Sequence, residues 1–183
     1  MAAPPSKTLH SLSGQWKLNK SCSDDFSQVL ALQGVNALVR KAATAASIHV
    51  KISQPDDQHI GMAQSITSGK IPGTTEEYTL DYEWRSNKDG FFGEVLGRSR
   101  WVTVDEARKL GVVGEGEGEW LEGGEGDGKL IHAEGKKEDE WEASHLWGFE
   151  VVDGERRHTR RVRVRNSKGE ELRVRMVYDF VEE

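Results

Sequence analysis

The sequence predicts a mainly β protein: an antiparallel up-and-down barrel of about ten strands, with a helix-turn-helix lid directly after the first strand. Three observations predict it. A Gly-x-Trp strand and two short amphipathic helices open the chain over residues 13–46, alternating strand patterns follow, and tight turns join the last three strands. Helices of about three turns each are too short to form a bundle of their own, so they must pack on a sheet. Closure of that sheet into a barrel would leave no exposed edge strand.

The first strand and the helix pair have clear signals. From Gly14 to Lys20 apolar and polar residues alternate, as in a half-buried strand. Ser23 is a suitable N-cap for a first helix that Gly34 ends, and two aspartates in its first turn would complement the helix dipole. The second helix is predicted from Asn36 to Ala46, with its apolar side chains on or near one side.

The middle of the chain alternates with period 2 between turn residues. We expect strands over 48–53, 59–67, 78–84 and 91–104 (the last as one strand or two), a bend from Gly69 to Gly73, and a hairpin turn over 87–90. The 78–84 segment places four apolar side chains on one face: Tyr78, Leu80, Tyr82 and Trp84. The Asp89-Gly90 dipeptide supplies the positive φ angles that a tight hairpin requires.

The last third ends in a three-stranded meander. A helical turn over 105–110 leads into a Gly- and Glu-rich segment at about 111–128, which we expect to be a solvated hairpin or loop. It lacks the spacing of a calcium-binding loop, so we expect no metal. The remaining strands are predicted over 129–137, 141–152, 156–165 and 171–181. Residues 1–12 are expected to be a flexible lead and 13–183 a single barrel domain.

The composition disfavours nucleic acid and membrane insertion. The 183 residues carry 25 Lys and Arg against 31 Asp and Glu, a net charge of −6, whereas phosphate binding needs a basic surplus. The basic run over 155–165 would divide between two strand faces and form a cross-strand charge ladder with acidic neighbours. Cys22 is the single cysteine, which excludes an intrachain disulfide. With no apolar run of signal-peptide or membrane-span length, these features predict a cytoplasmic protein; they set no oligomeric state.

Several segments near the N-terminus resemble, in order, the opening of the cytosolic fatty-acid-binding proteins: Gly14-Gln-Trp16-Lys17-Leu18, Asp24-Asp25, Leu32-Gln-Gly34-Val35 and Arg40-Lys41-Ala42. The last strand, ending Val177-Tyr178-Asp179-Phe180, resembles that family's closing strand. The chain is also similar to uncharacterised fungal lipocalin-like proteins. The resemblance implies a lidded barrel around an apolar ligand.

Two departures limit what the resemblance implies. Fatty-acid-binding proteins commonly hold the ligand carboxylate with an arginine two positions before the last-strand tyrosine, and Met176 stands there before Tyr178. The chain is also longer than that family's, mostly between Ser86 and Glu140. We therefore expect a ligand other than a simple fatty acid.

One strand parity of a small barrel points inward. On the last strand, we expect Tyr178 and every second residue before it to face inward. On the preceding strand the apolar content selects His158, Arg160, Val162 and Val164 as the inward face. Every second residue from Trp141 to Phe149 forms a third inward row. The expected lining of an apolar cavity is Met62, Tyr78, Tyr82, Trp84, Trp147, Met176 and Tyr178, with His145 and Arg160 as polar anchors. Alternatively these aromatic residues form a packed core, and Arg160 pairs with Glu142 or Glu150.

These residues support three hypotheses of function. The first is binding of a small hydrophobic ligand, such as a lipid, terpenoid or polyketide-like molecule. The second is a cofactor-independent isomerase or cyclase acting on an apolar natural-product intermediate, with His145 as acid or base and Arg160 stabilising negative charge. The third is an interaction module without a ligand. Nucleophile elbows, nucleotide-binding loops and metal-ligand motifs are missing from the sequence, so we expect no cofactor.

Overall fold

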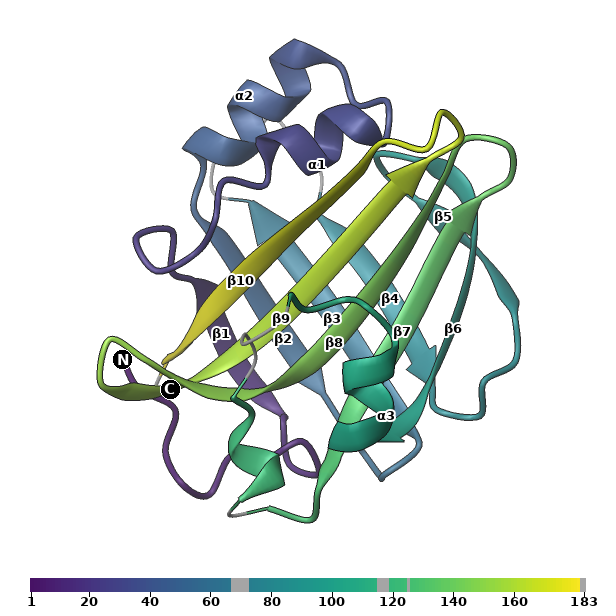
Figure 1. The fold of residues 1–183 in the computed structure, drawn as a ribbon. Coiled ribbons are helices and arrows are strands. Elements are labelled where there is room, and N and C mark those ends of the chain that lie inside the picture. Colours follow the sequence, from purple (N-terminus) through teal and green to yellow (C-terminus); the bar gives the residue numbers. More distant parts are fainter. Residues whose placement is uncertain (67–72, 115–118, 125, 182–183) are drawn as a thin grey trace.

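The computed structural model describes residues 1–66, 73–114, 119–124 and 126–181. Within this part of the chain, ten strands form one antiparallel sheet in the order β4-β3-β2-β1-β10-β9-β8-β7-β6-β5, with helices α1 and α2 between β1 and β2 (Figure 1). The predicted barrel and its lid are thereby confirmed. The strands span Gly14–Leu18 (β1), Ile48–Ser53 (β2), His59–Ile66 (β3), Thr74–Thr79 (β4), Arg85–Asp89 (β5), Gly93–Thr103 (β6), Lys129–Lys137 (β7), Trp141–Val152 (β8), Glu155–Asn166 (β9) and Glu171–Val181 (β10).

The two ends of the chain meet in the barrel wall. β1 pairs with β2 on one side and with β10 on the other, so Trp16 has Val50 and Phe180 as its cross-strand neighbours. The strands at the two ends of the sheet order, β4 and β5, have no described pairing with each other; an isolated bridge joins Asp81 to Arg100 nearby. The barrel is therefore nearly closed, with a seam between β4 and β5.

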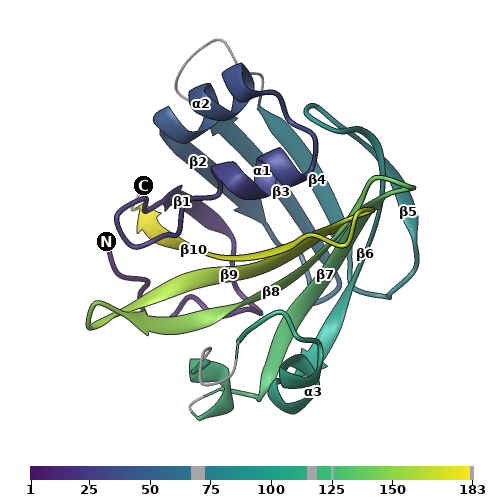
Figure 2. The same cartoon turned by 45° about the horizontal axis from the view of Figure 1, so that its top comes forward.

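Helices α1 (Ser27–Leu32) and α2 (Ala37–Ala45) cover one end of the barrel (Figures 1 and 2). The predicted stop of the first helix is confirmed, because Gly34 follows its C-cap with φ +84°. The predicted start of the second is confirmed too: the Asn36 side chain accepts a hydrogen bond from the Val39 amide at 3.0 Å. The pair forms the lid.

The first helix begins later than predicted. Ser23 does not cap it, because the Ser23 hydroxyl donates to the Asn19 carbonyl at 2.6 Å and accepts from the Val177 amide at 2.8 Å. These bonds tie the chain to β10 before the helix starts. The Asp25 carboxylate accepts from the Ser27 amide at 2.9 Å and so still supports the first helical residue.

The predicted strand over 78–84 is wrong beyond Thr79. Tyr82 has φ +66°, which turns the chain at that residue. The centres of the Tyr82 and Trp84 rings lie 3.8 and 4.3 Å from the guanidinium carbon of Arg98, an outward-facing side chain of β6. These cation–π contacts hold both rings on the outside of the barrel.

The predicted hairpin turn over 87–90 lies slightly later in the chain. Asp89 still belongs to β5, and its carboxylate accepts hydrogen bonds from the amides of Phe91 and Phe92 at 2.6 and 2.9 Å. The turn therefore spans residues 90–92, and the segment over 91–104 contains one strand rather than two.

The predicted helical turn over 105–110 is confirmed as α3, Val104–Lys109. The helix starts with a capping box, in which the Thr103 hydroxyl accepts from the Glu106 amide and the Glu106 carboxylate accepts from the Thr103 amide. The meander of β8, β9 and β10 is also confirmed.

Part of the Gly- and Glu-rich segment packs on the barrel, so the prediction of a solvated loop is wrong there. Trp120 and Glu122 are buried. Trp120 lies against Gly148 of β8, where a Cβ atom would come within 2.3 Å of the indole. The Glu122 carboxylate accepts from the Phe149 amide at 3.0 Å, in a part of β8 beyond its described pairing with β7.

Two predictions fall partly outside the described residues. Of Thr67 and the bend from Gly69 to Gly73, only Gly73 is described. In the Gly- and Glu-rich segment, residues 115–118 and 125 are not described.

The end of the barrel opposite the lid is filled. Residues 1–12, predicted to be a flexible lead, pack there instead, with Leu9 and Leu12 buried. The Trp16 indole N–H donates to the Leu12 carbonyl at 3.0 Å, and Trp16 itself is 1% exposed. Because this end is solid, free interior space lies on the lid side.

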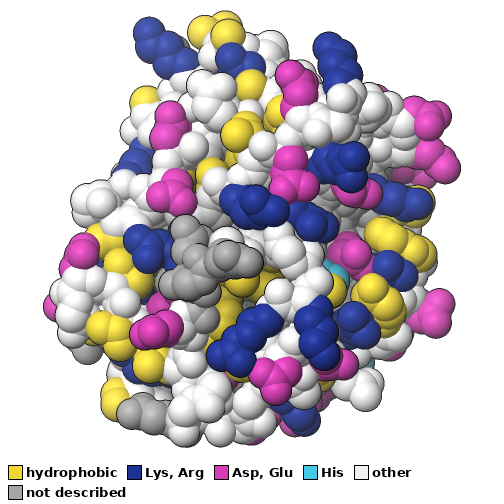
Figure 3. All heavy atoms as spheres, viewed as in Figure 1, with side chains coloured by type: hydrophobic (Ala, Val, Ile, Leu, Met, Phe, Trp, Pro, Cys, Tyr) yellow, Lys and Arg dark blue, Asp and Glu magenta, His cyan; other side chains and the backbone are white. Residues whose placement is uncertain are grey.

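Charged side chains of both signs cover the outer face seen in Figure 3. Arg161 pairs with Glu150 at 2.8 Å, and Arg157 pairs with Asp179 across the β9–β10 region. These arginines of the basic run thus pair with acidic residues of the neighbouring strands, although the partners are Glu150 and Asp179 and not the acidic residues expected at 138–142 and 170–171. Among the described helices, none has both the length and the apolar character that crossing a bilayer demands.

Candidate functional site

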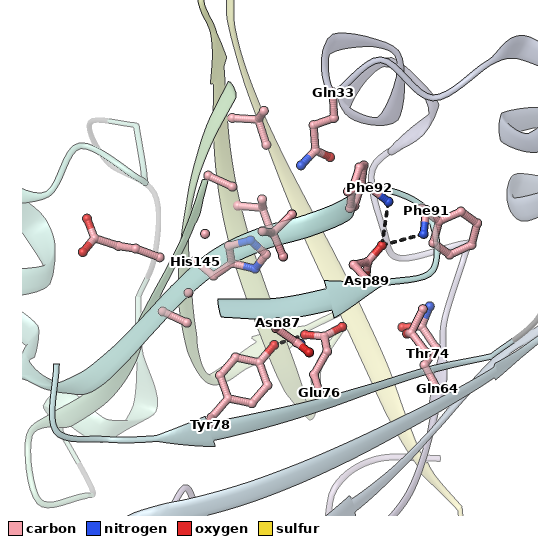
Figure 4. Close-up of a pocket in the computed structure, with 18 of the residues that line it drawn as sticks. Gln33, Gln64, Thr74, Glu76, Tyr78, Asn87, Asp89, Phe91, Phe92 and His145 are labelled. Carbon is pink, nitrogen blue, oxygen red and sulfur yellow. Dashed lines mark hydrogen bonds between the residues drawn. The ribbon is translucent and has the colours of Figure 1, made fainter. Parts of the chain in front are cut away.

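A cavity of about 420 Å³ lies between the lid and the filled end of the barrel. Its volume is within the usual range of small-molecule sites. The apolar part of its lining comes from both lid helices, the hairpin turn before β6 and the barrel wall: Phe26, Val29, Leu30, Ala43, Ile48, Ile66, Phe91, Phe92, Val95, Leu96, Ala133, Trp141, Ala143, Val162, Val164, Val174 and Met176. Figure 4 shows its polar groups, which come largely from the two strands beside the seam.

Inward-facing side chains of β6 to β10 form rows across the wall, because directly paired residues of antiparallel strands face the same side. The row on the filled-end side of the cavity is Trp101, Ile131, Trp147, Arg160 and Met176, and the row of Phe149, His158 and Tyr178 lies beyond it. The next row toward the lid is Ser99, Ala133, His145, Val162 and Val174. The third is Gly97, Gly135, Ala143, Val164 and Leu172. The parity expected for the last three strands therefore holds in the structure.

Glu76 and Tyr78 form a hydrogen-bonded pair at the cavity. They are two residues apart on β4 and so face the same side, and the Tyr78 hydroxyl donates to the Glu76 carboxylate (Figure 4). Burial raises the pKa of Glu76 above its ordinary value, against the opposing effects of the Tyr78 bond and the Arg160 charge. Burial and then the Glu76 charge raise the pKa of Tyr78 well above 10, so its hydroxyl stays protonated.

His145 presents its imidazole to the cavity (Figure 4). Protein surrounds the ring, and it makes no hydrogen bond with any other residue that the structure describes. Burial, followed by the charge of Arg160, lowers the pKa of His145 to about 4. At neutral pH the ring is therefore uncharged, with one N–H to donate and one nitrogen to accept.

Arg160 lies behind the cavity, in the same row as Trp147 and Met176. It is 5% exposed, and its guanidinium carbon lies 4.0 and 5.0 Å from the ring centres of Trp147 and Tyr178. Its Nη1 donates to the Met62 sulfur at 2.9 Å, and its Nη2 has no hydrogen-bond partner among the described residues. The expected pairing of Arg160 with Glu150 is wrong, because Glu150 pairs with Arg161.

The structure gathers some of the predicted site residues and separates others. Tyr78, His145 and Met176 line the cavity. Arg160 lies beneath the cavity, and Met62, Trp147 and Tyr178 pack around its guanidinium. Tyr82 and Trp84 are not among the described lining residues, because the turn at Tyr82 and the contacts with Arg98 place them on the outer face, with Trp84 39% exposed. Glu142, the other expected partner of Arg160, has no described ion pair with it.

Sequence reasoning missed the polar groups beside the seam. They include Thr74 and Glu76 of β4 and Asn87 and Asp89 of β5, and Gln64 of β3 lies near them at the cavity. Glu76 had a usable signal, because it alternates with Tyr78 along the same strand. Asn87 and Asp89 had none, since their composition is that of a turn. Among the described residues, no three or more His, Cys, Asp and Glu side chains are arranged to hold a metal ion.

Comparison with known proteins gives two kinds of likeness. No protein-family model matches the chain. The probable pericyclase scpY of Mollisia scopiformis is 31% identical over 186 residues, which cover 98% of this chain and 95% of the relative. The pericyclase pydY of Acremonium sp is 30% identical over 189 residues, covering 99% and 97%.

Solved structures of lower identity share the fold. The Schistosoma mansoni fatty acid binding protein in complex with arachidonic acid superposes with a TM-score of 0.60 at 14% identity, covering 96% of this chain and all of that one. Human cRBP IV gives a TM-score of 0.57 at 12% identity, covering 93% and 98%. The chain thus has the barrel fold of the fatty-acid-binding proteins, and it belongs to the family of the pericyclases scpY and pydY.

Proposed function

We propose that the protein is a cofactor-independent cyclase that closes a ring in an apolar, unsaturated natural-product intermediate by a pericyclic reaction. The observation that carries the proposal is the lidded apolar cavity faced by a protonated tyrosine and an uncharged histidine, Tyr78 and His145, with the Glu76 carboxyl hydrogen-bonded to Tyr78. The pericyclases scpY and pydY, related over almost the full chain, support the reaction class.

A pericyclic ring closure places modest chemical demands on the protein. In a [4+2] closure, three π bonds become two σ bonds and one π bond within one molecule, so no atom, proton or redox equivalent is exchanged. Part of the barrier comes from folding a flexible chain so that its reacting carbons meet, and this part is the one that a binding site can lower by orientation. Holding reacting groups in that geometry is worth roughly 7–11 kcal/mol in favourable intramolecular cases. A shaped cavity closed by a lid supplies this orientation and excludes water.

The polar groups can add electrostatic assistance. A hydrogen bond from His145 to a carbonyl conjugated with the reacting alkene would withdraw electrons and stabilise the transition state. Tyr78 has a single O–H, so it would donate to the same carbonyl by exchanging its bond to Glu76 for one to the ligand. The charge of Arg160 opposes the rise in the pKa values of Glu76 and Tyr78 and adds to the fall in the pKa of His145, so Arg160 lies close to all three groups. In the proposal it therefore contributes positive potential from behind the cavity, and His145 contributes a neutral donor or acceptor rather than a charged acid.

The second candidate is a carrier that binds a hydrophobic ligand and releases it unchanged. The same apolar cavity favours this function, since burial stabilises a ligand by about 25 cal/mol per Å² before the costs of association. The two candidates differ in whether the ligand leaves as an isomer.

The test uses a linear polyene that bears a conjugated diene and an α,β-unsaturated carbonyl. We expect the purified protein to convert it to a cyclic isomer of equal mass, detected by liquid chromatography and mass spectrometry. Tyr78→Phe should slow the conversion roughly tenfold to a hundredfold. Tyr82→Phe is the matched control, because it removes the same hydroxyl from the outer face. Bound substrate recovered unchanged, at the rate seen without protein, would establish the carrier instead.

A further inference from the structure

One part of the cavity wall is built from very small side chains. Gly97 of β6 and Gly135 of β7 are direct cross-strand partners, and Ala143 of β8 is the next residue in the same row. The neighbouring row adds Ser99 and Ala133. All five line the cavity, and we refer to them as the small-residue patch. Glycine weakens a strand interior, so a paired set of glycines there indicates close approach of another group.

Backbone geometry does not require these glycines. Neither Gly97 nor Gly135 has a positive φ. A Cβ atom at Gly97 would lie 3.6 Å from its nearest neighbour, the Glu134 carbonyl oxygen, and one at Gly135 would lie 3.9 Å from the Leu96 carbonyl oxygen. These are ordinary contact distances. Gly148 contrasts with both, because Trp120 fills the space beside it; at the patch the space is open to the cavity.

His145 supplies a second, independent indication of a ligand. It stands in the row of Ser99 and Ala133, with Ala133 as its direct partner on β7. Because these neighbours are small, they leave the imidazole uncovered, and the ring points into the cavity without a described hydrogen-bond partner (Figure 4). An imidazole that faces a cavity with free donor and acceptor capacity is a group that a ligand can satisfy.

The patch also has aromatic walls beside it. Trp141, two residues before Ala143 on β8, lines the cavity and packs edge-on against Phe92, with ring centres 5.0 Å apart. At Gly97 and Gly135 no side chain covers the backbone of β6 and β7 on the cavity side, and Trp141 stands beside this gap, so the wall has a shallow slot there. Such a slot admits a flat ring system, whereas a single alkyl chain would leave much of it empty.

We propose that the small-residue patch seats the bulkiest rigid part of the substrate, a flat ring or conjugated system bearing an oxygen or nitrogen that hydrogen-bonds to His145, and that Gly97 and Gly135 determine this specificity. The proposal rests on the proposed function for the identity of the ligand as a substrate. To the proposed function it adds one feature of the substrate, a flat ring or conjugated system with an oxygen or nitrogen at its edge, in addition to the chain that reacts.

The test measures binding, and it therefore does not depend on turnover. Pyrene serves as the flat probe and cis-parinaric acid as the slender one, both followed by fluorescence titration. The variants are Gly97→Ala, Gly135→Ala and the pair together. Gly61→Ala is the matched control, because it adds the same methyl group to a strand on the outer face, beside the flexible end of Glu77.

We expect wild type to bind both probes. The double variant should lose roughly tenfold or more in affinity for pyrene and less than about twofold for cis-parinaric acid. Its melting temperature should equal or exceed that of wild type, since alanine fits both sites and restricts the unfolded chain. Loss of binding together with undiminished stability would separate a specificity role from a structural one.

The failures of the two proposals are distinguishable. Equal changes for the two probes in the double variant, or no change for either, would overturn the role of the patch while leaving the cyclase intact. Binding of cis-parinaric acid without pyrene in wild type would also overturn it. Lack of binding of both probes to wild type would overturn the ligand-binding cavity and the patch together.

Discussion

Replacing His145 with glutamine tests whether the imidazole in the cavity is neutral. The pKa of this ring is about 4 in the folded protein against 6.5 when unperturbed, because burial and the charge of Arg160 disfavour the imidazolium form. Below pH 6.5 the unfolded chain takes up a proton at His145 and the folded protein does not. This residue therefore makes the free energy of unfolding fall as the pH drops from 6.5 to 4, and leaves it unaffected above 6.5.

The size of the effect follows from the two pKa values. Their difference, at about 1.36 kcal/mol per pH unit, gives a limit of roughly 3 kcal/mol, of which about 2 kcal/mol is expressed at pH 5. Glutamine is polar and does not titrate, so His145→Gln removes this dependence. We expect the stability of the variant relative to wild type to rise by about 2 kcal/mol between pH 7.5 and 5.

Urea unfolding followed by tryptophan fluorescence at several pH values measures this difference. His132 and His158 also have lowered pKa values, so both proteins lose stability in acid and only the difference between them reports on His145. A difference that stays constant from pH 7.5 to 5 would refute the reasoning. It would show that the ring takes up protons as readily in the cavity as in the unfolded chain.

Two further predictions concern the segment that packs on β8. Burial raises the pKa of Glu122 to about 7, so its carboxyl lowers the free energy of unfolding as the pH rises from 4.5 past 7. Glu122→Gln should therefore raise the free energy of unfolding at pH 8 by up to about 3 kcal/mol and leave it nearly unchanged at pH 4.5. Urea titrations measure both values, and equal gains at the two pH values would contradict this prediction. Gly148→Ala should cost about 1–3 kcal/mol, because the new methyl group overlaps the Trp120 ring, and an unchanged melting temperature would show that the indole is not held there.

Local patterns predicted the elements that contain their own signals. The helix pair was predictable because Asn36 and Gly34 mark its turn by their backbone preferences. The inward rows of the last three strands were predictable because apolar residues alternate continuously through hairpins whose turns fix the register. For these segments the contacts that decide the structure lie within or next to the segment itself.

The errors share the opposite cause, contacts between residues far apart in sequence. The alternation over 78–84 could not show that the chain turns at Tyr82, because the stabilising partner is Arg98 on another strand. Likewise, the composition around Trp120 indicates a solvated loop, and only the missing side chain of Gly148 explains why it packs. Glu76 is different, because its alternation with Tyr78 on one strand was a local signal that the sequence reasoning did not use.

The departure from the fatty-acid-binding pattern at Met176 has a structural counterpart. Met176 lies directly across from Arg160, so the wall carries one guanidinium at this level, and that group is occupied by the faces of Trp147 and Tyr178. The groups that line the cavity instead include a protonated tyrosine, a neutral histidine and the Glu76 carboxyl, which repels an anionic ligand when it is ionised. Desolvating a ligand carboxylate costs far more than desolvating a carbonyl, and neutral donors recover less of that cost. The cavity is therefore better matched to a neutral ligand with a carbonyl than to a fatty acid, and a polarised carbonyl is the group through which a hydrogen bond accelerates the proposed ring closure.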